Sequence, residues 1–104
     1  MMTPALNVIV SGAVRQGGHH LINAPATVES AIQAAGGLMT TDRMHPSGII
    51  TVRRPLGNRK VDVWQWNMTE MGSGDWKNFV LQTGDAVIVQ WAFHLEEHEE
   101  SSTV

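Results

Sequence analysis

Four cations in the middle of the sequence could together bind an anionic ligand. They flank a short stretch that contains Pro55 and Gly57, and they are Arg53, Arg54, Arg59 and Lys60. Arginine forms paired hydrogen bonds with phosphate and carboxylate groups. The stretch therefore predicts a contact patch for phosphates, uronates or other carboxylates. The alternative is a solvated hairpin tip, since long charged side chains are mostly exposed.

Tryptophan is the second residue type that could contact a ligand, because the chain has four tryptophans and no tyrosine. Trp64 and Trp66 are two residues apart, so in a strand they share one face. If exposed, these rings could stack on sugars or nucleobases; if packed inward, they form core or a hydrophobic edge. Trp76 lies in a predicted loop and could contact a ligand or pack inward. Trp91 continues an apolar strand face and is predicted to belong to the core.

The same residues do not suggest catalysis. An enzyme needs a nucleophile or an acid–base pair held in a pocket, and the carboxylates of the body show no pairing at useful spacing. There is no cysteine, which excludes thiolate and disulfide chemistry. We therefore expect a non-enzyme without a cofactor. Its predicted ligand-binding residues are Arg53, Arg54, Arg59, Lys60, Trp64, Trp66 and Trp76.

The five histidines do not predict a metal site. His94, Glu97 and His98 would share one face of a helix and could chelate a metal ion. Nothing in the sequence positions that segment, so we expect solvated side chains there. His19 and His20 are adjacent, so in a strand they point to opposite faces and cannot chelate together.

A scaffold must position these side chains, and residues 27–37 lie at its centre. The apolar residues of this segment recur at i, i+3, i+4 and i+7, which predicts an amphipathic helix; they are Val28, Ala31, Ile32 and Ala35. Thr27 is a suitable N-cap, and Gly36 and Gly37 end the helix. So short a helix is marginal alone in water, and a sheet must cover its apolar stripe.

The flanking segments predict that sheet. Strands are expected over residues 7–14, 19–22, 49–54, 59–66 and 86–93, with turns at 55–58 and 82–85 and loops at 38–48 and 67–78. The order of elements favours an α+β fold in which a mixed sheet of about five strands packs on one main helix. This is the arrangement of a β-grasp (ubiquitin-like) domain.

Length and charge predict one domain with a distinct C-terminal segment. The chain has 104 residues and a net charge of −3. Without Glu96, Glu97, Glu99 and Glu100, seven basic residues face six acidic ones, so the acidity belongs to the end of the chain. We expect a domain over residues 1–94 and a disordered acidic tail over 95–104. No apolar run is long enough for a membrane helix, and the N-terminus shows no signal peptide.

Four segments resemble the SLBB, or soluble-ligand-binding β-grasp, family. Residues 8–18 (VIVSGAVRQGG) are similar to its opening V-x-V-x-G-x-V-x-x-P-G, with Gly17 where the pattern has proline. Residues 27–37 (TVESAIQAAGG) match its helix T-[LV]-x-x-A-I-x-x-A-G-G. Residues 50–54 (ITVRR) match V-x-V-x-R, and residues 81–89 (LQTGDAVIV) match L-x-x-G-D-x-V-x-V. The segments occur in the family's order, and they carry no catalytic residue.

The resemblance implies a non-catalytic ligand-binding or assembly module of bacterial polysaccharide export, which binds anionic or neutral glycan or packs against like domains. It implies a periplasmic or cell-envelope location if the chain is part of a longer export protein; a complete chain would be cytoplasmic. A second hypothesis is a protein–protein interaction module, self-associating or binding a partner through a sheet edge. Nucleic-acid binding, as in competence-type relatives, is the least favoured, because the body is near neutral. No membrane insertion is expected.

Overall fold

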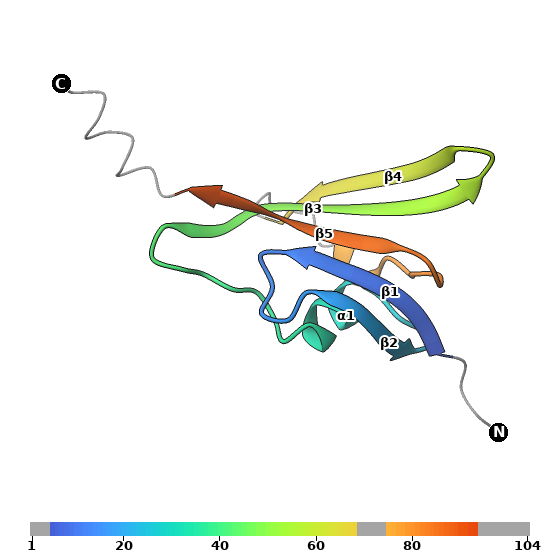
Figure 1. Cartoon of the computed structure of the whole chain (residues 1–104), viewed down its shortest axis with the longest axis horizontal. Helices are drawn as coiled ribbons and strands as arrows, with labels where there is room; N and C mark the ends of the chain where they lie inside the picture. The colour runs from blue at the N-terminus through green and yellow to red at the C-terminus, as the bar shows by residue number, and fades with distance from the viewer. Residues whose placement is uncertain (1–4, 69–74, 94–104) are drawn as a thin grey trace.

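The computed structural model describes residues 5–68 and 75–93, which form one mixed sheet with two helices (Figure 1). In chain order the elements are β1 (Ala5–Gly12), β2 (Gly18–Asn23), α1 (Val28–Ala34), β3 (Met44–Gly57), β4 (Lys60–Asn67), α2 (Asp75–Asn78) and β5 (Ala86–Phe93). The five strands lie in the order β2-β1-β5-β3-β4. β1 is parallel to β5, and every other neighbouring pair is antiparallel. The expected α+β class and the five-stranded mixed sheet are confirmed.

α1 forms where the sequence predicts it, because both of its ends carry strong signals. At the start, the Thr27 side chain accepts a hydrogen bond from the Ser30 amide (3.2 Å), and the Ser30 hydroxyl oxygen accepts one from the Thr27 amide (2.8 Å). This reciprocal arrangement is a capping box. At the end, Gly36 and Gly37 have φ of +85° and +88°, a conformation that disfavours residues with a Cβ. The helix lies against one face of the sheet (Figure 1).

The core lies between α1 and that face of the sheet. The apolar stripe of α1 packs against alternating residues of the three central strands, and all of these side chains are buried: Val28, Ala31, Ile32, Val8, Val10, Val87, Val89, Ile50 and Val52. The opposite face of the sheet carries no helix among the described residues. We call it the helix-free face.

Several predicted boundaries are wrong. β1 spans residues 5–12 instead of 7–14, and the ends of β2 and β4 differ from the prediction by one residue. β3 begins at Met44 within the expected loop, because residues 44–46 pair with residues 91–93 of β5 beyond an irregularity between Pro46 and Ile50. The turn expected at 55–58 is made by Asn58 and Arg59, and β3 continues to Gly57. α2 occupies the end of the loop expected over 67–78; residues 69–74 of that loop lie outside the described residues.

The β3–β4 hairpin is longer than the strand beside it. β3 pairs with β5 only as far as Arg53↔Ala86, whereas it pairs with β4 as far as Gly57↔Lys60. The end of the hairpin therefore projects past β5 as a two-stranded arm (Figure 1, upper right). We call residues 55–61 the hairpin arm.

Candidate functional site

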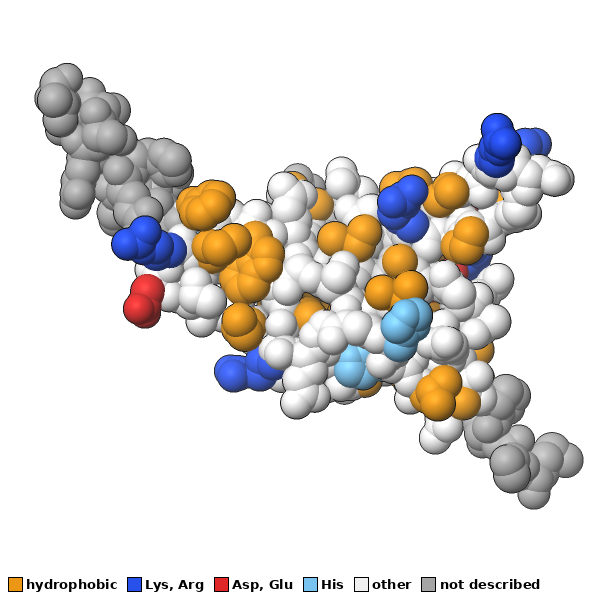
Figure 2. Space-filling model, viewed as in Figure 1, with side chains coloured by type: hydrophobic (Ala, Val, Ile, Leu, Met, Phe, Trp, Pro, Cys, Tyr) orange, Lys and Arg blue, Asp and Glu red, His pale blue; other side chains and the backbone are white. Residues whose placement is uncertain are grey.

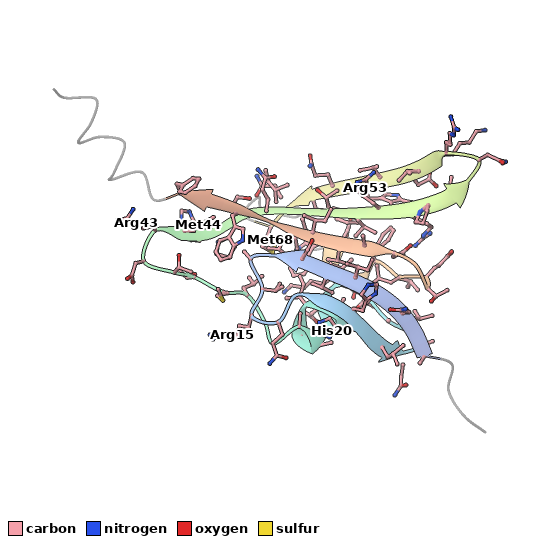
Figure 3. All side chains as sticks on the ribbon, in the orientation of Figure 1. Arg15, His20, Arg43, Met44, Arg53 and Met68 are labelled. Atoms are coloured by element: carbon pink, nitrogen blue, oxygen red, sulfur yellow. The ribbon has the colours of Figure 1, made fainter. Side chains whose placement is uncertain are left out.

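The seven predicted ligand-binding residues do not form one site, because the sheet separates them. Side chains alternate between faces along a strand. Arg54 is in step with buried Val52 and lies on the side of α1, whereas Arg53 lies on the helix-free face. Figure 3 labels Arg53 over the β3–β4 hairpin, far from Arg43 at the other end of the molecule. The two adjacent arginines therefore have different surroundings and need separate accounts.

Arg54 forms an ion pair with Asp85, a carboxylate that is 0 % exposed. Its Nε donates to Oδ1 and its Nη2 donates to Oδ2, both at 2.9 Å, and the Gln82 amide also donates to Oδ2 at 2.8 Å. Nη2 also donates to the carbonyl oxygen of Val80 at 3.3 Å. The hydrogen bond with Asp85 is the main cause that raises the pKa of Arg54 above its ordinary value; burial opposes it. The bidentate geometry that suits a bound carboxylate is thus satisfied within the protein.

The tryptophans on the same side of the sheet form an aromatic cluster around Phe79. Trp64 and Trp66 pair with buried Val52 and Ile50 across β3 and β4, so they share the face that packs on the core. The ring centroids of Trp64 and Trp66 lie 4.8 and 5.0 Å from that of Phe79. The Arg54 guanidinium lies 4.8 Å from the Trp64 centroid, within the range of a cation–π contact. Both tryptophans are half-buried.

Trp76 and Trp91 are also half-buried and pack against the core. Trp76 lies on α2, and the ammonium of Lys77 is 5.7 Å from its ring centroid. Trp91 lies on β5 and follows the buried face of that strand, as the sequence predicts. A ligand contact by Trp64, Trp66 or Trp76 stays a prediction, since each ring keeps only part of its surface open.

Arg59 and Lys60 are exposed at the end of the hairpin arm. Asn58 and Arg59 have φ of +52° and +64°, so the turn places two consecutive residues in the left-handed region. This geometry matches the right-handed twist of the paired strands and favours Asn followed by Gly. Asn58 suits its position, but arginine at position 59 is strained relative to glycine. In Figure 2, basic side chains gather at this end of the molecule (upper right).

The helix-free face is largely apolar around Arg53. The exposed hydrophobic residues of this face come from three strands: Ile9 from β1, Leu21 (76 % exposed) from β2, and Val61 and Val63 (57 %) from β4. Figure 2 shows hydrophobic side chains spread over this part of the surface. A hollow of about 290 Å³ opens here, lined by residues of β1, β3, β4 and β5 and by Gly84. We call it the Arg53 hollow.

The sequence does not reveal three features of these surfaces: the ion-pair partner of Arg54, the role of Phe79 and the Arg53 hollow. It assigned Asp85 to turn chemistry, which is correct because the Asp85 amide donates to the Gln82 carbonyl oxygen at 3.1 Å, but it did not find the pair with Arg54. It gave Phe79 no role, although this ring joins two tryptophans. It did not find the Arg53 hollow. The alternation of side chains along residues 49–54 was the available signal, since it already separates Arg53 from Arg54.

Within residues 5–68 and 75–93, no group of three or more His, Asp or Glu side chains could hold a metal ion. No helix of that described part is long and apolar enough to cross a membrane. The possible chelating set His94, Glu97 and His98 and the expected tail over 95–104 lie outside the described residues.

These features define a small α+β binding module, with a structural ion pair on one side of its sheet and an open, partly cationic surface on the other. The model of the SLBB domain family matches residues 6–89. The chain therefore belongs to the SLBB family, as its four motifs suggest. A comparison with curated proteins found no match. The family consists of ligand-binding domains that are generally non-catalytic.

Proposed function

We propose that the chain is a non-catalytic module of bacterial polysaccharide export that binds an anionic glycan through the cations of its β3–β4 hairpin. The observation that carries the proposal is the grouping of Arg59 and Lys60 at the tip of an arm that projects past β5, with Arg53 further back on the same hairpin. The only ion pair between described residues uses Arg54, so these three cations have no carboxylate partner there. The proposal also includes the finer fold assignment, a β-grasp domain over residues 1–94.

The strain at Arg59 supports a role for this side chain in binding. A non-glycine residue in the left-handed region costs roughly 1–2 kcal/mol, and glycine would make the same turn without that cost. Arginine at this position therefore gives up stability for an exposed cation at the tip. Uronate carboxylates are ligands that a guanidinium binds well. Strain retained at a surface position is a physical reason to look for function there.

The test is a calorimetric titration of the full chain with oligogalacturonate and, in parallel, with neutral maltohexaose. We expect saturable binding of the acidic oligosaccharide that weakens with added salt. The double variant R59Q/K60Q should bind at least fivefold more weakly. The matched control is R43Q/K77Q, which removes the same charge from exposed positions away from the hairpin. Absence of binding, or equal losses in the two double variants, would refute the proposal.

A second candidate function is association with another protein chain through the edge of the sheet. β4 is an edge strand in the described sheet, and Val63 on it is 57 % exposed. Unpaired edges with apolar side chains can pair with another strand. Sedimentation analysis of the wild type should then show a concentration-dependent dimer, and V63K should be monomeric. A wild type that stays monomeric at all concentrations, or a V63K variant that dimerises equally, would exclude this pairing.

A further inference from the structure

The Arg53 hollow combines aliphatic walls with one cation. Pro55, Val61, Ala86 and Ile88 form the walls, and Ser11 and Gly84 complete the lining with Arg53. The register explains the arrangement: Arg53 lies beside Ala86 of β5 on one side and Val63 of β4 on the other. Its cross-strand neighbours on the helix-free face are thus aliphatic.

Arg53 is the charged member of this lining, and unlike Arg54 it has no ion-pair partner among the described residues. The ion pair found among residues 5–68 and 75–93 belongs to Arg54 and Asp85 on the other face. Two carboxylates lie near this part of β3, and both are on the side of Arg54: Asp62 pairs with Arg54 across β3 and β4, and Asp85 accepts hydrogen bonds from Arg54. No carboxylate of the described part therefore competes for the Arg53 guanidinium.

The size and the lining of the hollow restrict its ligand. About 290 Å³ is at the lower limit of small-molecule sites, so a fragment-sized compound fits. The aliphatic walls offer no partner for several hydroxyl groups, and Ser11 supplies the hydroxyl of the lining. A polyhydroxylated sugar would therefore lose hydrogen bonds to water on entering. An apolar body gains from burial against the walls, while an anionic group can take a charge-assisted hydrogen bond from Arg53.

We propose that the Arg53 hollow binds a small carboxylic acid with an apolar body, whose carboxylate contacts Arg53 and whose hydrocarbon part packs on Val61, Ala86 and Ile88. The ligand class differs from the hydroxylated glycan assigned to the hairpin tip. Arg53 belongs to both proposals, so their tests use different ligands and different variants.

The test is a titration of the isotope-labelled full chain with hexanoate, followed by the backbone amide signals in NMR spectra. Hexanamide is the matched uncharged ligand. We expect saturable shifts centred on the amides of Val61, Ala86 and Ile88, with hexanoate bound at least fivefold more tightly than hexanamide. Equal affinity for the two compounds, or shifts centred elsewhere, would overturn the proposal.

Two variants test the two halves of the ligand. R53Q should abolish the preference for hexanoate over hexanamide, and A86L, which adds bulk within the hollow, should weaken both compounds. R59Q is the control, because it removes a cation of the hairpin tip and should leave hexanoate binding unchanged. If R53Q keeps the preference, or if R59Q lowers it as much as R53Q does, the assignment to the hollow is wrong. If hexanoate binds and oligogalacturonate does not, only the glycan proposal is refuted.

Discussion

The substitution R54M tests whether Arg54 has a structural role, and its effect can be worked out from the Asp85 environment. The Asp85 carboxylate is 0 % exposed and accepts two hydrogen bonds from Arg54 and one from the Gln82 amide. The substitution removes the cation and two of these three donors. Leaving a buried charge without its partner costs about 3–5 kcal/mol. Since the Arg54 side chain is 17 % exposed, solvent screens the pair in part, and we expect about 3 kcal/mol.

The assay is urea denaturation of the full chain followed by tryptophan fluorescence. For a slope of about 2 kcal/mol per molar urea, a loss of about 3 kcal/mol lowers the midpoint by roughly 1.5 M. R53M is the matched control: it changes the adjacent residue on the same strand, but that side chain is exposed on the helix-free face and has no carboxylate partner among the described residues. Its stability should change by no more than about 0.5 kcal/mol.

A double-mutant cycle separates the ion pair from general packing. D85N should cost less than R54M, because the partly exposed guanidinium can still reach water. R54M/D85N leaves no buried charge, so its cost should be lower than the sum of the single costs by about 1–2 kcal/mol. A loss below about 1 kcal/mol in R54M, or additive single costs, would refute this account. Arg54 would then be open to the ligand role that the sequence suggests.

Four further substitutions test local features of the fold. T27A removes the capping box of α1 and should lower the free energy of unfolding by about 1 kcal/mol, measured by urea denaturation. G12A should lower the free energy of unfolding by more than about 3 kcal/mol or prevent folding, because the added Cβ would overlap the Val89 carbonyl. G37A is its matched control: Gly37 has a φ of +88°, close to the +92° of Gly12, but has open space around it. G37A should therefore cost only the left-handed strain, about 1–2 kcal/mol. Equal thermal midpoints for these two glycine variants would contradict the steric argument. R59G should raise stability by about 0.5 kcal/mol, because the relief of about 1–2 kcal/mol of left-handed strain is partly offset by the larger conformational entropy of glycine in the unfolded chain. The same variant should weaken oligogalacturonate binding, and a destabilised R59G would remove the strain argument.

The sequence predicted the elements whose signals are local. The helix follows from its spacing, cap and terminal glycines, all within residues 27–37, and β5 has the predicted bounds of 86–93. The start of β3 was missed because Pro46 and Gly48 are typical of loops. Pairing with residues 91–93 of β5 overrides that local preference. The hairpin turn was predicted too early in the chain, because Pro55 is typical of turns but lies within β3.

The candidate site was less predictable, because it depends on which residues lie opposite each other across the sheet. Four cations close together in sequence looked like one patch. In the fold, Arg54 bonds to Asp85, which is 31 residues away in the turn before β5. Likewise, Trp64 and Trp66 share a face as predicted, but the contact with Phe79 requires the segment before β5 to cross over that face. Charge and aromatic spacing identify candidates, whereas long-range pairing decides which of them remain open.

The overhang of the β3–β4 hairpin past β5 has a consequence for motion. Its terminal residues have one strand neighbour each within the described sheet, so their amides are protected from exchange by a single ladder. Segments with few buried contacts open without unfolding the rest of a domain. Amide exchange should therefore be faster in residues 55–61 than in the paired centre of β3. A long, multivalent glycan seated on such an arm would reduce its freedom and bind with an entropic penalty. A ligand in the Arg53 hollow would contact the arm only at its base, through Pro55 and Val61, and the centre of the sheet through Ala86 and Ile88.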